Sequence, residues 1–124
     1  MQLLQKTPMN RLVEIRTYRL KPGTLEAFHE AVHERAVPML RSKGMDVVTY
    51  GRSDHEEETY HLVRAYESRE ALEAEQAKFY GSLEWRDGPR GDLVDRIDTY
   101  LNTLPWVSQD AVDSMRTLNP PAEF

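Results

Sequence analysis

The chain of 124 residues contains no cysteine. This absence excludes disulfide bonds, thiolate nucleophiles and metal sites built on cysteine. It also fits a cytoplasmic protein, which is the location we expect. The N-terminal residues contain no long apolar run, so the sequence predicts neither a secretory signal nor a membrane-spanning helix there.

Basic residues are fewer than acidic residues in this chain. Lys and Arg number 16 against 21 Asp and Glu, which gives a formal net charge of −5. A nucleic-acid footprint or contact with an anionic membrane requires a basic patch, so we expect neither partner. The 6 glycines are scattered, and none forms a glycine-rich phosphate loop.

Hydrophobic periodicity predicts four strands and two long helices. The strands are expected at residues 12–20, 45–52, 59–67 and 94–103, and the helices at residues 24–44 and 69–80, with a short helix at 106–118. The order β-α-β-β-α-β is the split ferredoxin-like pattern. It predicts an α+β fold in which an antiparallel sheet carries both helices on one face. We expect a flexible arm at residues 1–10, one domain at 11–105, and a C-terminal extension and tail at 106–124.

The strand at residues 12–20 carries polar groups on one of its two faces. Glu14, Arg16 and Tyr18 point to one side, and Val13 and Ile15 to the other. Because the smaller side chains suit contact with the helices, we expect the polar set on the uncovered face of the sheet.

The third predicted strand follows the same division. Tyr60, Leu62, Arg64 and Tyr66 share one face, which we assign to the uncovered side, and His61 then lies on the helix side. On the neighbouring strands, Tyr50 and Asp98 can join the uncovered face. An amphipathic surface of this size favours a partner, so we expect two copies to pair through it as a homodimer.

Three segments resemble a known family. The run Glu14-x-Arg16-x-Tyr18-x-Leu20-Lys21-Pro22-Gly23 resembles the opening of the NIPSNAP family, within the dimeric α/β-barrel superfamily. The strand from His61 to Glu67 and the segment from Phe79 to Trp85 resemble later parts of the family. Residues 81–83 depart from it, since the family tends to carry an Asp-Pro type turn there.

The resemblance implies a homodimer of ferredoxin-like protomers whose sheets meet in a dimeric α/β barrel. The superfamily includes cofactor-independent monooxygenases, isomerases, haem proteins and members without enzymatic activity. The resemblance therefore supplies no catalytic residues that can be transferred to this chain.

Two interpretations of the polar face remain open. In the first, a pocket inside the barrel binds a small carbonyl or enolisable compound, and a cofactor-free isomerase or monooxygenase acts on it. Negative charge on the compound would be held by guanidinium groups, phenols would donate hydrogen bonds, and a carboxylate or imidazole would move protons. The catalytic candidates are His61 and Glu14, and the ligand-binding candidates are Arg16, Tyr18, Arg64, Tyr66, Tyr50 and Asp98. In the second, the chain is a non-catalytic ligand-binding or structural dimerisation module.

The string His29-Glu30-Ala31-Val32-His33 matches the H-E-x-x-H pattern of zinc proteases. No Gly-x-x-His follows it, and we interpret it as a chance match on a Glu-rich amphipathic helix. We therefore expect no metal and no cofactor. A haem group would need an axial histidine inside the barrel, and the assignment of His61 to the helix side disfavours that arrangement.

Overall fold

The computed structural model describes residues 10–118. The predicted N-terminal arm and C-terminal tail fall largely on residues 1–9 and 119–124, outside the described residues. Elements in chain order are β1 (Asn10–Leu20), α1 (Leu25–Ala31), the π-helical turn η2 (Val32–Ala36), α2 (Val37–Ser42), β2 (Asp46–Arg52), β3 (Thr59–Tyr66), α3 (Arg69–Tyr80), α4 (Leu83–Asp87), α5 (Arg90–Val94), β4 (Ile97–Thr103), β5 (Trp106–Ser108) and α6 (Gln109–Leu118).

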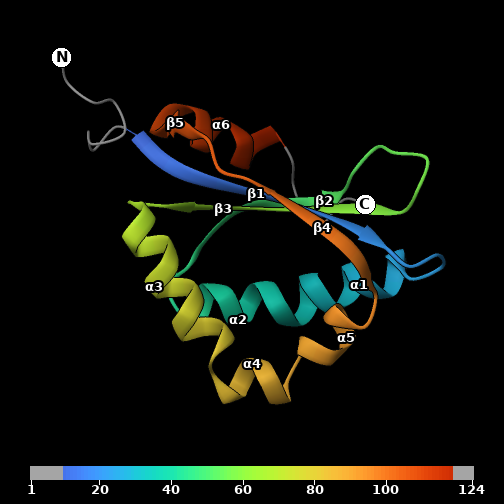
Figure 1. Cartoon of the computed structure of the whole chain (residues 1–124). Helices are drawn as coiled ribbons and strands as arrows, with labels where there is room; N and C mark the ends of the chain where they lie inside the picture. The colour runs from blue at the N-terminus through green and yellow to red at the C-terminus, as the bar shows by residue number, and fades with distance from the viewer. Residues whose placement is uncertain (1–9, 119–124) are drawn as a thin grey trace.

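The strands form one antiparallel sheet in the order β2-β3-β1-β4 (Figure 1). Strand β1 is central and long enough to pair with β3 on one side and with both β4 and β5 on the other. The first four strands and the two main helices follow the predicted ferredoxin-like order, which confirms the α+β fold class.

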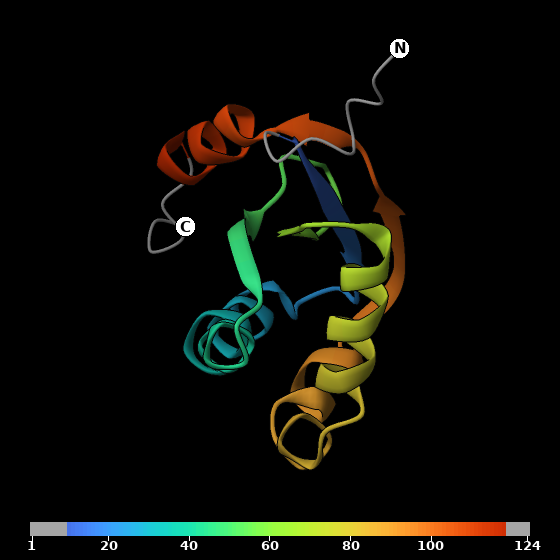
Figure 2. The same cartoon turned by 90° about the vertical axis from the view of Figure 1, so that its left-hand side faces the viewer.

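Helices α1 to α5 lie on one side of the sheet, and α6 lies on the other (Figures 1 and 2). The larger core fills the space beneath α1 to α5 and contains Leu12, Tyr18, Tyr60 and Tyr66 from the sheet. The smaller core, on the α6 side, is built from Val13, Val48, Val63, Ala65 and Val112.

The predicted assignment of the two faces was therefore wrong. The polar and aromatic side chains of β1 and β3 lie beneath the helices, and the small aliphatic side chains face the other way. Large phenol and indole rings fill the gap between the sheet and the helical layer, whereas Val and Ala allow α6 to pack closely. Arg16 and Tyr18 accordingly do not lie between two sheets.

The first helix continues through Pro38 by means of one π-helical turn. Proline lacks a backbone N–H and its ring clashes with the carbonyl one turn earlier. The wider turn at Val32–Ala36 relieves this conflict, and the Val37 N–H bonds the Val32 carbonyl. The helix thus reaches Leu40, whose side chain is buried in the larger core.

The turn that begins α1 is capped from a distant loop. The Glu58 carboxylate accepts hydrogen bonds from the backbone N–H groups of Gly23 at 2.6 Å and Leu25 at 2.8 Å. The Thr24 hydroxyl donates instead to the Lys21 carbonyl at 2.6 Å. The loop between β2 and β3 is therefore joined to the end of β1.

The segment after β4 is part of the sheet. The predicted helix at residues 106–118 begins at Gln109, because the first three residues form β5 and pair with Asn10–Leu12. Helix α6 then crosses the sheet, where Arg116 donates two hydrogen bonds of 2.7 Å to the Asp46 carboxylate. Among residues 10–118, no helix has the length and apolar character needed to cross a membrane.

Candidate functional site

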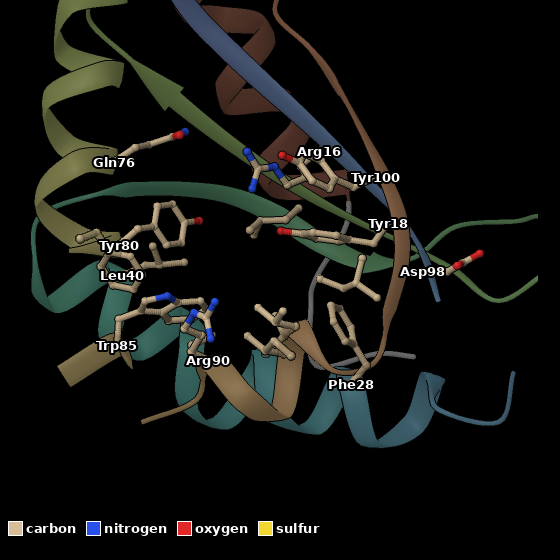
Figure 3. Close-up of a pocket in the computed structure, with 17 residues that line it drawn as sticks. Arg16, Tyr18, Phe28, Leu40, Gln76, Tyr80, Trp85, Arg90, Asp98 and Tyr100 are labelled. Atoms are coloured by element: carbon tan, nitrogen blue, oxygen red, sulfur yellow. The ribbon is translucent and has the colours of Figure 1, made fainter. Parts of the chain in front are cut away.

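A cavity of about 570 Å³ opens between the sheet and the helical layer (Figure 3). The size is typical of small-molecule sites, which run from about 300 to 1,000 Å³. Strand β1 contributes Arg16 and Tyr18, α3 contributes Gln76 and Tyr80, and α5 begins with Arg90. The two strand residues face the cavity together because side chains two apart on a strand share a face.

Behind the cavity, Glu14 is the centre of a buried polar network. It is 1% exposed and faces Arg64, which is fully buried on β3. Arg64 Nε donates to Glu14 Oε1 at 3.0 Å, and Arg64 Nη2 lies 2.6 Å from the same oxygen as an ion pair without hydrogen-bond alignment. Gln76 Nε2 donates to both carboxylate oxygens at 3.0 Å, and Asn102 Nδ2 donates to Oε2 at 3.1 Å.

This network fixes Arg16 at the cavity wall. Arg16 Nη2 donates to Glu14 at 3.3 Å, and Nε donates to Asn102 Oδ1 at 2.8 Å. The guanidinium carbon lies 4.7 Å from the centre of the Tyr100 ring, in a cation–π contact. Held on three sides, the guanidinium is positioned in advance to meet a negative oxygen in the cavity.

Two phenols approach the same space from opposite sides. The hydroxyl groups of Tyr18 and Tyr80 point toward one another across the cavity in Figure 3. Tyr80 Oη accepts a hydrogen bond of 2.7 Å from Arg64 Nη1, which leaves the hydroxyl hydrogen of Tyr80 to be donated elsewhere. Burial raises the pKa of the Tyr18 phenol to about 12, with Tyr80 acting in the same direction and the Arg16 and Arg64 guanidiniums opposing it. At neutral pH Tyr18 is therefore a hydrogen-bond donor and not a base.

Most of the remaining cavity wall is apolar. Phe79 and Trp85 pack with ring centres 5.3 Å apart, and Phe28 packs against Tyr18 at 5.5 Å. These rings exclude water from one side of the polar groups and thereby strengthen their interactions. The cavity combines donors at one end with an aromatic surface that suits a flat, compact molecule.

The family model for NIPSNAP matches residues 13–104, which run from within β1 to the end of β4 and include every residue that lines the cavity. The chain belongs to the NIPSNAP family. No match was found among curated proteins.

Solved structures of NIPSNAP proteins share this architecture. One from Agrobacterium tumefaciens, of unknown function, has a TM-score of 0.74 at 21% identity and covers 82% of this chain and 92% of its own. A NIPSNAP-like domain protein from Burkholderia xenovorans has a TM-score of 0.69 at 19% identity and covers 76% and 82%. A candidate antibiotic biosynthesis monooxygenase from Nitrosomonas europaea has a TM-score of 0.56 at 18% identity and covers 80% and 91%. At these identities the likeness shows the fold alone.

Three of the predicted site residues of this NIPSNAP chain line the cavity, namely Arg16, Tyr18 and Asp98. Asp98 differs from the other two because its carboxylate points away from the cavity in Figure 3. Its side chain is 54% exposed and lies 3.8 Å from Arg19 Nε. Arg16 and Tyr18 thus form the part of the prediction that the cavity brings together.

Three further predicted residues support the cavity from behind. Glu14 and Arg64 form the buried ion pair, and Tyr66 receives a hydrogen bond of 3.1 Å from Gln76. Glu14 already accepts hydrogen bonds from four side chains, including Arg16 and Gln76, so it acts on a ligand only through the groups it positions.

His61 and Tyr50 lie elsewhere. His61 projects from the sheet face opposite to the cavity, where its Nδ1 lies 2.9 Å from Ser53 Oγ, and burial lowers its pKa. The predicted helix-side position of His61 was wrong, because the neighbouring Tyr60 occupies that side. Tyr50 points toward the helices but lies 2.6 Å from His33 Nδ1 and outside the cavity lining.

Gln76, Tyr80 and Arg90 line the cavity but were absent from the predicted site. Gln76 and Tyr80 are four residues apart on α3, on the same side as the buried Leu72. The sequence did contain a signal for them, because two polar side chains follow Leu72 at intervals of four residues on the side of the helix that is buried. Arg90 had no such signal, because it lies between the helix predicted at residues 69–80 and the strand predicted at 94–103.

The H-E-x-x-H histidines take part in packing the helix on the sheet. His29 Nδ1 lies 2.6 Å from the Tyr60 hydroxyl, and His33 Nδ1 lies 2.6 Å from the Tyr50 hydroxyl. Their rings stack with centres 5.6 Å apart, and burial together with His33 lowers the pKa of His29. Within residues 10–118, no three His, Cys, Asp or Glu side chains are grouped to hold a metal ion.

Proposed function

We propose that this NIPSNAP protein binds a compact carbonyl or carboxylate compound in the cavity beneath its helices. The observation that supports this proposal is the convergence of three donors, Arg16, Tyr18 and Tyr80, on a space whose remaining walls are largely apolar. A negative oxygen placed among these donors gains charge-assisted hydrogen bonds, while the aromatic walls cover the rest of the molecule.

The same donors suit an enolate, which is the charged intermediate of many isomerisations and cofactor-free oxygenations. When a proton leaves the carbon next to a carbonyl group, the negative charge moves to the oxygen. Preorganised donors at that oxygen stabilise the charge as it develops. In our proposal the protein lowers the cost of forming the enolate, and solvent takes the proton.

A non-catalytic binding function is the second candidate, and one feature of the cavity favours it. Among the described residues that line the cavity, Asp98 is the sole carboxylate, it points outward, and no histidine is present. A general base normally lies within hydrogen-bond reach of the proton that it removes. Without such a group, the cavity would bind an anion and would not catalyse a reaction.

Binding and catalysis can be separated with one set of probes. We expect benzoate and the enolisable diketone benzoylacetone to raise the melting temperature of the wild-type protein. Tyr18→Phe removes one hydroxyl and keeps the ring packed on Phe28, so we expect affinity for both probes to fall about tenfold, equivalent to about 1.4 kcal/mol. Arg69→Ala, on the exposed surface of α3, is the matched control and should bind like wild type.

Exchange of the acidic proton of benzoylacetone for deuterium, followed by NMR, measures the enolate chemistry. Faster exchange with wild type than with Tyr18→Phe supports a catalytic site. Binding that weakens in the variant, with no acceleration of exchange by either protein, supports the non-catalytic alternative. Equal affinity of wild type and Tyr18→Phe for both probes would contradict the cavity as the binding site.

We also propose that the protein is a homodimer. Two features of the sheet support this arrangement: β4 is an exposed edge strand, and Leu101 on it is 69% exposed on the side opposite to the cavity. Unpaired strand edges and exposed leucines are features that proteins usually cover. In this form of the proposal, the dimer contact and the ligand cavity lie on different faces of the sheet.

A further inference from the structure

Arg90 is a cationic residue at the cavity. It begins α5, its side chain is exposed, and it lines the same space as Arg16 and Tyr18. Within residues 10–118 its guanidinium takes part in no hydrogen bond, ion pair or ring contact. The acid nearest to it on its own helix, Asp92, is engaged by Arg35 and Arg96.

Arg90 and Arg16 approach the cavity from different layers of the molecule. Arg16 extends from the sheet, whereas Arg90 lies in the helical layer beside Trp85, on the opposite side of the cavity in Figure 3. Apolar side chains such as Leu62 and Leu93 line the space between these layers. The cavity therefore has a cationic group at each side, with apolar side chains and the phenols of Tyr18 and Tyr80 between them.

The two arginines differ in how they are held. Arg16 is fixed by Glu14, Asn102 and Tyr100, and its charge is partly compensated by the buried carboxylate. No carboxylate within residues 10–118 compensates the charge of Arg90 in this way. An uncompensated guanidinium at a pocket gains most from an anionic partner supplied by the ligand, and its planar fork suits a carboxylate in particular.

We infer that the ligand carries two acidic groups at opposite ends of a flat apolar body, the first held at Arg16 and the second at Arg90. This inference rests on the proposed function and adds the class of compound, an aromatic or similarly planar dicarboxylate. The Arg16 end provides the donors for the reacting or anchoring oxygen, and the Arg90 end selects molecules with a second charge.

Matched pairs of probes test this inference by isothermal titration calorimetry. One pair is terephthalate and its monomethyl ester, and a longer pair is biphenyl-4,4′-dicarboxylate and biphenyl-4-carboxylate. Each pair shares a skeleton and differs in one charge. We expect wild type to bind the diacid of at least one pair about tenfold more tightly than its monoacid. Because Arg90 is exposed, this preference should shrink as salt is raised.

Variants of two neighbouring arginines assign the preference. Arg90→Gln should bring the ratio of the two dissociation constants to about one, and Arg90→Lys should restore part of it. Arg86→Gln changes an exposed arginine on α4 that does not line the cavity, and it should keep the wild-type ratio. Circular dichroism and the melting temperature check that the variants fold.

The possible results separate this inference from the function on which it rests. Monoacid binding without a preference for either diacid, or a preference that survives in Arg90→Gln, would overturn the role of Arg90 and leave the proposed function standing. If wild type binds none of the four probes, the inference about a diacid fails, and the proposed function fails as well if benzoate and benzoylacetone also do not bind.

Discussion

Single residues decide how charge is held inside this small protein. Glu14 is an internal anion that compensates the guanidiniums of Arg16 and Arg64, and side-chain donors surround both of its oxygens. Removing one partner of a buried ion pair leaves the other charge uncompensated in a medium of low dielectric constant. We therefore expect loss of Glu14 to destabilise the fold and to release Arg16 from its position.

We expect Glu14→Gln to lower the free energy of unfolding by about 3 kcal/mol, because two guanidiniums then lose their counter-charge. Urea-induced unfolding followed by circular dichroism measures the difference. Glu73→Gln removes an exposed carboxylate that pairs with Arg69, and it should cost less than about 0.5 kcal/mol. A Glu14→Gln protein as stable as the control would show that the buried carboxylate contributes little.

Arg16 and Tyr18 were predictable as site residues because strand alternation places them on one face whichever way the strand is turned. Arg64 was predictable for the same reason, although it lies behind the cavity. His61 and Tyr50 failed at the level of single residues. His61 lies on the face of β3 opposite to Tyr60. Whether its side chain faces the helices therefore depends on which face of the sheet the helices cover. Tyr50 faces the helices, but His33 engages its hydroxyl.

At the scale of secondary structure elements, the order of strands and helices followed from the sequence, but the covered face did not. Both faces of β1 carry apolar residues, so hydrophobicity alone does not distinguish them. The deciding factor is volume: the helical layer stands over the Tyr60 and Tyr66 rings, and α6 packs on Val63 and Ala65. The sequence pattern of a single strand contains no information about the thickness of the layer above it.

The start of α1 shows how one element depends on another. The loop at residues 54–58 is rich in carboxylates, and its last residue, Glu58, caps the turn before α1. Hydrogen bonds from the backbone of Gly23 and Leu25 hold the pKa of Glu58 below its usual value. A group whose pKa is lower in the folded state stabilises the fold above its unfolded pKa, and that contribution is lost as pH falls through the folded value.

We therefore expect Glu58→Gln to lower the melting temperature at pH 7, where the wild-type carboxylate is charged. The difference between the two proteins should narrow as pH falls below about 4.3, the ordinary pKa of a glutamate, because the wild-type carboxylate then becomes protonated. Differential scanning fluorimetry from pH 7 to pH 3 follows this trend. Glu56→Gln, in the same loop, serves as the control. A difference that stays constant with pH would contradict capping by the charged form.

At the scale of the whole molecule, the two faces of the sheet differ. One face, with the polar network and aromatic rings, encloses the cavity under α1 to α5. The other face is covered by α6 over only part of its area, and Leu101 on the edge strand β4 stays exposed. In the proposed homodimer, burial of that surface against a second copy would stabilise a chain of this small size.

We expect the wild-type protein to elute as a species of twice the chain mass in size-exclusion chromatography with light scattering. Leu101→Glu places a charge in the proposed contact and should shift the protein toward the monomer, because an unpaired charge is costly to bury between two sheets. Leu83, on α4, is exposed to nearly the same extent, 68% against 69%, but lies in the helical layer. Leu83→Glu should therefore stay dimeric, and a monomeric wild type would refute the arrangement.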